Sequence, residues 1–124
     1  GFHRARFRFD NLLSQRVYAN RGSFMLLRAS AIEAAKYMDE STFLYYEEPI
    51  LAERLAKIGL ECWHCADTWV IHQHAATIKT SVQKRNGLRI LNKSYKYYLV
   101  KYRRMNLIAV RICLIVRYVL ASRR

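Results

Sequence analysis

The fold is decided by residues 43–55, whose sequence is FLYYEEPILAERL. An aromatic run leads directly into a segment with helical spacing, and Pro49 suits the first turn of a helix because its missing N–H is not needed there. Gly59 is typical of the residue that follows a helix. We therefore predict a helix that begins near Glu47 and ends before Gly59. Its apolar face consists of Ile50, Leu51, Leu55 and Ile58.

Two further elements are predicted on the N-terminal side of this helix. Residues 22–28, with the sequence GSFMLLR, form a short apolar run after a glycine and are typical of a buried strand. Ser30 is a good helix N-cap, and Glu33 three residues later completes a capping-box pattern. This pattern predicts a short helix after Ser30 that continues to about Tyr37.

Two short strands and a basic helix are predicted on the C-terminal side. Residues 60–65 and 68–72 have the composition of short strands. Residues 82–102 have the spacing of a helix and carry many basic side chains. The aromatic and apolar residues that share this spacing are Tyr95, Tyr98, Leu99 and Tyr102.

Residues 105–121 are almost entirely apolar, but Arg111 and Arg117 interrupt them. A membrane-spanning helix needs about 20 apolar residues, and each central arginine opposes insertion. We therefore expect an amphipathic helix that lies on a membrane surface or packs on a partner. A core helix of a larger domain is an equally good interpretation.

The composition is that of a folded, strongly basic chain. Its 124 residues are 52% hydrophobic, and 22 basic against 9 acidic side chains give a net charge of +13. Disordered and collagen-like classes are excluded because they lack this apolar content. Residues 31–67 contain eight of the nine acids, whereas residues 68–124 contain thirteen basic residues and no acid. Such a tail is attracted to nucleic acid, acidic lipid headgroups or a phosphorylated ligand.

The cysteines indicate a reducing environment. The chain has an odd number of cysteines, Cys62, Cys65 and Cys113, and shows no signal peptide. Both observations favour a cytoplasmic location. The N-terminus has no initiating Met and no apolar leader, so we expect it to be a cut end. Cys62-x-x-Cys65 and His72-x-His74 offer zinc-type ligands, but their spacing does not fit a zinc finger. Buried cysteines in a strand are the preferred interpretation.

Five segments, taken in order, resemble the pattern of family 2 glycosyltransferases. They are residues 22–28, Met38-Asp39-Glu40, residues 43–55, Gly59 and Val70-Ile71-His72. The chain is similar in particular to bacterial members that build surface polysaccharides, including rhamnosyltransferase-like ones. The resemblance spans roughly residues 18–80. It implies an α+β chain of short strands and several helices, the acceptor-side, C-terminal portion of a GT-A α/β fold. The implied activity transfers a sugar from a nucleotide-sugar donor to a hydroxyl of a glycan or lipid-linked acceptor.

The same resemblance implies roles for individual residues. Glu48 takes the position of the family's catalytic base, and Glu47 is the neighbouring acid that orients the acceptor. Arg54 falls on a helix arginine that supports this loop or lies near the donor phosphates. His72 falls on a strand-end histidine that in some members helps bind a divalent metal, Mg or Mn, or the diphosphate; the alternative is a structural histidine. The aromatic residues expected to support acceptor and donor are Tyr45 and Tyr46.

The chain departs from the family pattern at three positions and lacks its first half. Glu48 stands for the usual Asp, Ile50 for a common second Asp, and Met38 for the usual Phe. No Asp-x-Asp metal motif occurs, so the fold is incomplete without an N-terminal nucleotide-binding half. We expect this chain alone to be inactive and to bind no metal. Residues 1–80 would be the acceptor-side part, and residues 81–124 a basic helical extension associated with a membrane.

The basic tail has three interpretations. In the first, it docks at the inner face of the plasma membrane, near a lipid-linked acceptor. In the second, the chain is a nucleic-acid-binding module whose tyrosines stack on bases, although it has no recognition motif and residues 105–121 are too apolar. In the third, it is an oligomerisation module without catalysis, a homo-oligomer that covers an exposed sheet edge. The tyrosines in question are Tyr95, Tyr97, Tyr98 and Tyr102.

Overall fold

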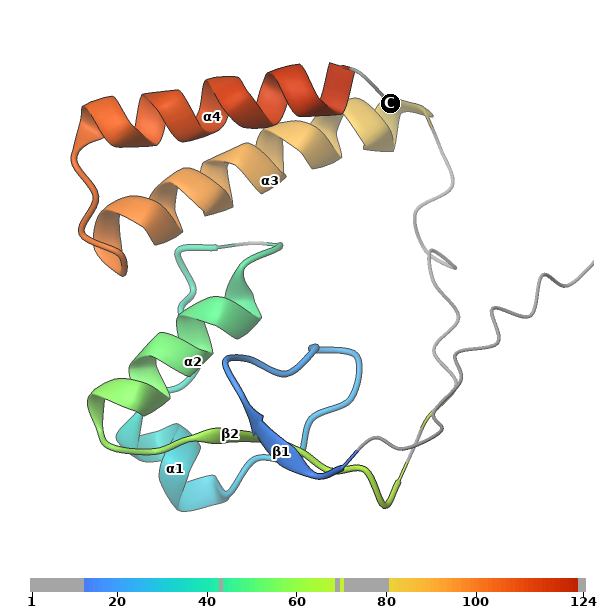
Figure 1. Cartoon of the computed structure of the whole chain (residues 1–124), viewed down its shortest axis with the longest axis vertical. Helices are drawn as coiled ribbons and strands as arrows, with labels where there is room; N and C mark the ends of the chain where they lie inside the picture. The colour runs from blue at the N-terminus through green and yellow to red at the C-terminus, as the bar shows by residue number, and fades with distance from the viewer. Residues whose placement is uncertain (1–12, 43, 69, 71–80, 123–124) are drawn as a thin grey trace, which may run out of the picture.

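The chain folds into four helices and a small two-stranded sheet within the part that the structure describes (Figure 1). The computed structural model describes residues 13–42, 44–68, 70 and 81–122, with the backbone alone for residues 81–85 and 121–122. The arrangement belongs to the α+β class, as the sequence predicted. In chain order, the elements are β1 (Gln15–Val17), α1 (Ala29–Ala34), α2 (Glu47–Lys57), β2 (Cys62–His64), α3 (Ser81–Lys101) and α4 (Leu107–Ser122).

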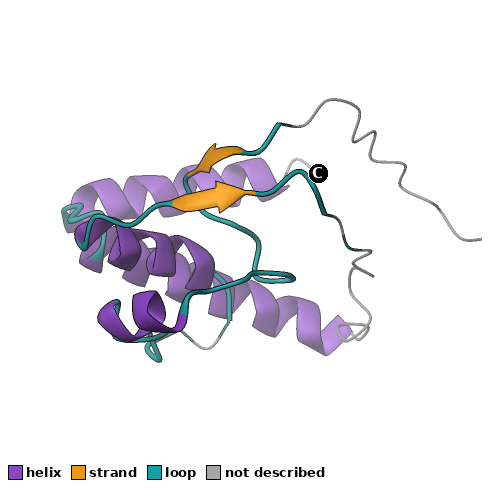
Figure 2. Ribbon diagram, turned by 90° about the horizontal axis from the view of Figure 1, so that it is seen from below, coloured by secondary structure: helices purple, strands orange, loops and turns teal. Residues whose placement is uncertain are grey.

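The sheet joins the region before α1 to the region after α2. Strands β1 and β2 pair in antiparallel fashion, with Arg16 opposite Trp63 and Val17 opposite Cys62 (Figure 2). An exposed ion pair between Arg16 and Glu61, 3.1 Å long, lies beside this ladder. The predicted strand at 60–65 is confirmed in shorter form. Only Cys62–His64 face a partner on β1, which is itself three residues long.

Helix α2 occupies the centre of the described fold because its apolar residues pack in two directions. Ile50 is fully buried in one cluster with residues of α3 and α4. Leu51 and Leu55 are buried in a second cluster with Ala35, which follows α1. The predicted helix start at Glu47 is confirmed. Ile58, expected on the same apolar face, is instead 43% exposed because it already lies past the last helical residue.

The end of α2 follows the predicted chemistry. Gly59 adopts a left-handed conformation with φ of 75°, which glycine adopts without steric cost. Its N–H donates to the carbonyl oxygen of Ala56 at 3.1 Å, and the N–H of Leu60 donates to that of Leu55 at 3.0 Å. These bonds satisfy carbonyls that the helix leaves unpaired at its end.

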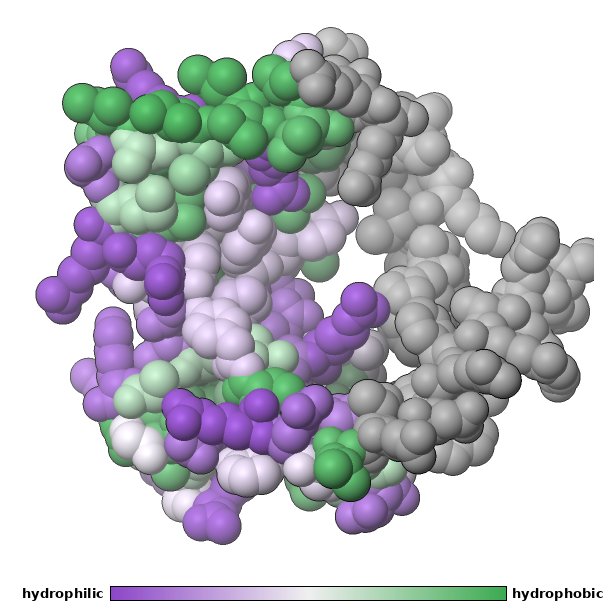
Figure 3. Space-filling view, viewed as in Figure 1, coloured by the Kyte–Doolittle hydropathy of each residue, from purple (hydrophilic) through white to green (hydrophobic). Residues whose placement is uncertain are grey.

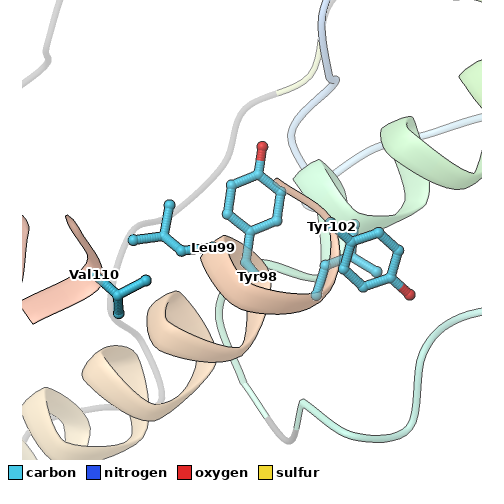
Figure 4. Close-up of a cluster of buried hydrophobic side chains, with 5 residues drawn as sticks. Tyr98, Leu99, Tyr102 and Val110 are labelled. Carbon is cyan, nitrogen blue, oxygen red and sulfur yellow. The ribbon is translucent and has the colours of Figure 1, made fainter. Parts of the chain in front are cut away.

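Helices α3 and α4 run antiparallel beside each other and cover α2 on one side (Figure 1). The first was predicted from its helical spacing and the second from its apolar composition, and both helices are confirmed. Figure 4 shows the side chains that hold them together, with Leu99 of α3 directed toward Val110 of α4. Tyr98 and Tyr102 complete this cluster from α3 and the residue after it. The two predicted segments, 1–80 and 81–124, therefore share a core among the described residues.

The predicted strand at residues 22–28 is wrong. This segment has no strand, and Leu26 is 97% exposed. An apolar run forms a strand only where a ladder partner is available, and β2 pairs with β1 instead. Likewise, Thr68 and Val70 are not in a strand, whereas the rest of the predicted strand 68–72 lies outside the described residues.

The predicted capping box at Ser30 is also wrong. Helix α1 begins at Ala29, one residue earlier, and its N-cap Arg28 forms no side-chain capping bond. The helix ends at Ala34 rather than near Tyr37, because Lys36 and Tyr37 both adopt left-handed backbone angles that no helix continues through.

Candidate functional site

The two predicted catalytic acids, Glu47 and Glu48, form the first turn of α2. The unpaired backbone N–H groups of a helix start favour negative charge there. Tyr46 is the N-cap residue with φ of 68°, so the chain turns sharply just before the two carboxylates. The local sequence thus places two adjacent acids, both half-buried, at the positive end of an 11-residue helix.

Glu48 is oriented by a glycine that lies 26 residues earlier in the chain. The backbone N–H of Gly22 donates to Glu48 Oε1 at 2.9 Å. A Cβ at position 22 would lie only 2.8 Å from the same oxygen. Only glycine therefore lets the backbone approach this carboxylate without displacing it. The sequence singled out both residues but could not show that they touch.

Glu47 differs from its neighbour because one of its oxygens has no partner. Oε2 is buried and accepts no hydrogen bond from the part of the chain that the structure describes. Buried polar atoms are usually paired. This oxygen therefore keeps a hydrogen-bonding capacity that the described residues do not use.

The aromatic residues before the acids are fixed on α3. The ring of Tyr46 stacks on Tyr95 and Tyr98, with centroid distances of 5.2 and 5.4 Å. Arg117 of α4 donates to Tyr46 Oη at 3.1 Å. Ser94 Oγ donates to the carbonyl oxygen of Leu44 at 2.8 Å. The approach to the acids is therefore held by contacts from both C-terminal helices.

Tyr45 repeats the unusual backbone of its neighbour. Its φ of 69° is left-handed, like that of Tyr46. Its hydroxyl lies 3.7 Å from where a Cβ on Gly87 would stand, which places the ring tip beside α3. Phe43, at the start of the same run, lies outside the described residues.

Arg54 is anchored on the loop between α1 and α2. Its Nη1 donates to the carbonyl oxygens of Lys36 and Tyr37 at 3.0 and 2.8 Å, and its Nη2 lies 3.1 Å from Asp39 Oδ2. It lies six positions after Glu48 along the helix, a rise of about 9 Å. Within the described residues, Arg54 thus contacts the loop and is not grouped with the two acids.

Asp39 gathers the densest set of polar contacts, a group we call the Asp39 cluster. Its side chain is 4% exposed. Tyr97 Oη donates to Asp39 Oδ2 at 2.8 Å, Tyr102 Oη donates at 2.5 Å, and Lys101 Nζ lies at 3.4 Å. The N–H of Ser41 donates to the other oxygen at 3.0 Å. Arg54, described above, completes the cluster.

The Asp39 cluster stabilises the ionised carboxylate. Burial by itself would raise the pKa of Asp39, but the hydrogen bonds from Tyr102, Ser41 and Tyr97 outweigh it and hold the pKa well below its usual range. Burial raises the pKa of Tyr102, and the neighbouring carboxylate adds to this effect. Sequence reasoning included Asp39 in the family pattern but assigned it no function. The available signal was its place two residues before Ser41, which suits a side-chain turn.

A second acid, Glu53, ties β1 to the end of α3. Tyr18 Oη donates to Glu53 Oε1 at 2.7 Å, and Arg103 Nη1 forms an ion pair with it at 2.9 Å. Tyr98 Oη lies 2.6 Å from Tyr18 Oη. Burial would raise the pKa of Glu53, but the bonds from Tyr18 and Arg103 lower it. Nothing in the sequence singled out Glu53 beforehand, since its partners lie far away in the chain.

The described residues offer no metal site. No three His, Cys, Asp or Glu side chains within them could hold a metal ion. His72 and His74 lie outside the described residues. Cys62 is half-buried in β2, where burial raises the pKa of its thiol. Cys65 is exposed and follows the strand, so the interpretation of two buried strand cysteines is wrong for Cys65.

A groove of about 370 Å³ lies between β1, β2 and α2, away from the two acids. Val17, Ala52 and Cys62 are among the residues that line it. None of the predicted site residues lines it, so the candidate site is defined by Glu47 and Glu48 rather than by this groove.

Comparison of the chain with protein-family models, curated proteins and solved structures gave no match.

Proposed function

We propose that this chain is the acceptor-side part of a family 2 glycosyltransferase with a GT-A fold. The enzyme would transfer a sugar from a nucleotide-sugar donor to a hydroxyl of a glycan or lipid-linked acceptor, in the synthesis of bacterial surface polysaccharide. One observation carries the proposal. Gly22 and Glu48, which belong to separate segments of the family pattern, meet through a hydrogen bond of 2.9 Å.

A second contact supports the same reading. Asp39 and Arg54, from two further segments of the pattern, form an ion pair of 3.1 Å. If the segments of the family pattern form one site, they must contact each other in the fold, as these pairs do. The exposed segment 22–28 departs from it, because the family pattern has a strand there.

The proposed chemistry assigns the base to Glu48. One of its oxygens accepts a hydrogen bond from the N–H of Gly22, which fixes the position of the carboxylate. The carboxylate would take the proton of the acceptor hydroxyl while that oxygen attacks the anomeric carbon. The bond from the anomeric carbon to the diphosphate breaks, and the nucleoside diphosphate leaves with the electron pair. Glu47, the neighbouring acid in the same helical turn, would orient the acceptor.

The divalent metal that the resemblance implies does not fit the described residues. They supply no group of three ligands. No step above therefore runs through a metal, and its ligands would be His72, outside the described residues, together with groups of the donor-side half. Arg54 is engaged with the loop, so its proposed role is to hold that loop in place.

The tyrosines that the nucleic-acid alternative invokes are engaged within this fold. Tyr98 and Tyr102 are buried, and Tyr97 donates its hydroxyl to Asp39. Tyr95 stacks on Tyr46 and lies beneath Arg117. Base stacking needs an open ring face, and these tyrosines use their rings and hydroxyls within the core.

The test is an assay on the protein encoded by the complete reading frame that contains this chain. Release of nucleoside diphosphate would be measured over a panel of nucleotide-sugars with Mg²⁺ or Mn²⁺. We expect Glu48→Gln to lower kcat by roughly 10²–10⁴-fold, as for loss of a general base. Glu48→Asp should keep part of the activity. The matched control is Glu33→Gln, an exposed acid on α1 that should leave the rate unchanged.

Two results would overturn the proposal. One is a reading frame that contains no Asp-x-Asp segment upstream of Gly1. The other is full activity of the Glu48→Gln protein. Turnover by the 124-residue chain alone would contradict the assignment of donor binding to the missing half.

A further inference from the structure

Helix α4 exposes an apolar face on the side opposite its core contacts. Val110 is fully buried, and Cys113, Leu114 and Arg117 also point toward α3 and α2. The residues on the opposite face follow helical spacing i, i+4, i+7, i+11. They are Ile108 (74% exposed), Ile112 (57%), Ile115 (62%) and Val119 (43%). We call these four residues the α4 outer face.

The α4 outer face is continuous with further exposed apolar residues. Figure 3 shows hydrophobic residues gathered along α4 at the upper edge of the molecule. Leu107, Val116, Tyr118 and Leu120 flank the four. A helix with apolar side chains on opposite faces is normally buried by other groups on both faces. A large exposed apolar patch marks an interaction site.

The charged side chains of α3 and α4 are all basic. No acidic residue occurs after Asp67 in the sequence. Arg111 lies on α4 beside its outer face, and Arg104 lies in the turn that leads into α4; both are exposed. Lys93 and Lys96 are exposed on α3. The partner that fits this combination has an apolar layer next to an anionic one. A bilayer surface with acidic headgroups has this chemistry.

The described part of this helix is shorter than a bilayer's hydrocarbon layer. Its 16 residues correspond to about 24 Å, less than the bilayer's hydrocarbon thickness of about 30 Å. None of the helices in the described ranges is long and apolar enough to cross a membrane. A second copy of this chain fits less well, because two such faces would bring basic helices together without any acid between them.

We propose that α4 lies in the plane of an anionic phospholipid bilayer, with its outer face in the boundary between headgroups and acyl chains. Arg111 extends from beside this face to the lipid phosphates, and its aliphatic stem covers apolar surface. This inference rests on α4 and the basic residues of the C-terminal helix pair, and it does not depend on the proposed glycosyltransferase activity.

Sedimentation of the full chain with lipid vesicles tests the inference. The vesicles are phosphatidylcholine alone, or three parts phosphatidylcholine with one part phosphatidylglycerol. We expect binding to the anionic vesicles that weakens with salt. The double variant Ile108→Gln, Ile115→Gln should lower partitioning by at least about tenfold, because both side chains leave the apolar layer. Arg111→Gln should lower it about fivefold.

The matched control is the double variant Leu26→Gln, Leu88→Gln, which changes two exposed leucines outside α4. It should bind vesicles as the unaltered chain does. All variants replace exposed residues, so their circular dichroism and urea midpoints should match the unaltered chain. Vesicle binding is measured without any sugar transfer. A negative result would therefore contradict the membrane inference without bearing on the proposed function.

Three results would overturn the inference. One is no binding to the anionic vesicles, and another is an equal loss in the Leu26→Gln, Leu88→Gln control. The third is a dimer in light scattering that the Ile108→Gln, Ile115→Gln variant dissolves, which would assign the α4 outer face to a second copy of this chain.

Discussion

Asp39 shows how one buried carboxylate can hold distant parts of this chain together. Its two oxygens accept hydrogen bonds from Ser41 nearby and from Tyr97 and Tyr102 far along the sequence. Arg54 and Lys101 supply positive charge. Such a group is costly to bury alone but is stabilised when every lone pair has a donor.

The first prediction concerns Asp39→Asn. We expect the free energy of unfolding to fall by about 2–4 kcal/mol, because Arg54 is left beside the loop without its counter-charge. Urea denaturation followed by circular dichroism measures this change. The control is Asp67→Asn, an exposed acid, which should change stability by less than about 0.5 kcal/mol. Equal stability of the two variants would contradict the stabilising role of the Asp39 cluster.

The second prediction separates the position of Glu48 from overall stability. Gly22→Ala places a methyl group 2.8 Å from Glu48 Oε1, the far end of a flexible side chain. The carboxylate should therefore move while the free energy of unfolding changes by less than about 1 kcal/mol. The ¹³C chemical shift of the Glu48 carboxyl carbon reports the movement.

Gly59→Ala is the counterpart of that substitution. At φ of 75° an alanine is strained, and we expect a loss of about 1 kcal/mol with the Glu48 signal unchanged. A Glu48 shift that stays fixed in Gly22→Ala would contradict the contact between the two residues.

At this scale the sequence predicted what depends on near neighbours. Gly59 was predicted because the end of a helix needs a left-handed residue. The Glu47 and Glu48 pair was predicted because acids favour a helix start. The Asp39 cluster could not be predicted, since its tyrosine donors lie 58 and 63 residues away and only tertiary packing brings them together.

Among the elements, α4 is the one whose two sides differ most in what they contact. Val110 is 1% exposed in the core, whereas Ile108 on the same helix is 74% exposed. Similar aliphatic side chains two positions apart therefore have opposite roles, and the helix orientation can be tested by comparing them.

The third prediction uses this pair. Val110→Ala should lower the free energy of unfolding by about 1–3 kcal/mol, because it opens a cavity between α3 and α4. Ile108→Ala should change it by less than about 0.5 kcal/mol. Both values follow from urea denaturation in the absence of lipid. A larger loss for Ile108→Ala than for Val110→Ala would mean that α4 is rotated about its axis.

The three longer helices were predicted because α2 and α3 show helical apolar spacing and α4 is a long apolar run. Helices α2, α3 and α4 begin within two residues of the positions that the sequence indicated. The strands were harder because three residues carry little periodicity, and β1 had no prediction at all. The apolar run at 22–28 shows that hydrophobicity alone does not supply a ladder partner.

On the scale of the whole molecule, acids of the central segment meet the basic C-terminal helices. Asp39 pairs with Lys101, and Glu53 pairs with Arg103, at the end of α3. The uneven charge seen in the sequence thus has a structural role, because it attaches one part of the fold to another. The sequence showed the charge asymmetry but not which charges meet.

The fourth prediction follows from these acids. The pKa values of Asp39 and Glu53 are lower in the folded chain than in the unfolded one. Their stabilising contribution is therefore complete above the unfolded pKa values, near about 4, and is lost as the pH falls. We expect the free energy of unfolding to drop by about 1–2 kcal/mol between about pH 5 and pH 3.

Urea denaturation at a series of pH values measures this dependence. In Asp39→Asn the drop should be smaller, because one of the two acids no longer titrates. An identical drop in the variant and the unaltered chain would show that other carboxyl groups carry the acid sensitivity.

Tyr45 and Tyr46, which both have left-handed backbone angles, limit the substitutions that this sequence can accept during evolution. Each such residue costs roughly 1 kcal/mol that glycine would not. At position 46 that cost is offset by two stacked rings and an arginine, so glycine there would remove more than it relieves. At position 45 no stacked ring or arginine is found among the described residues, and the hydroxyl lies beside Gly87 of α3. Relatives of this chain should therefore replace Tyr45 by glycine or asparagine far more readily than Tyr46.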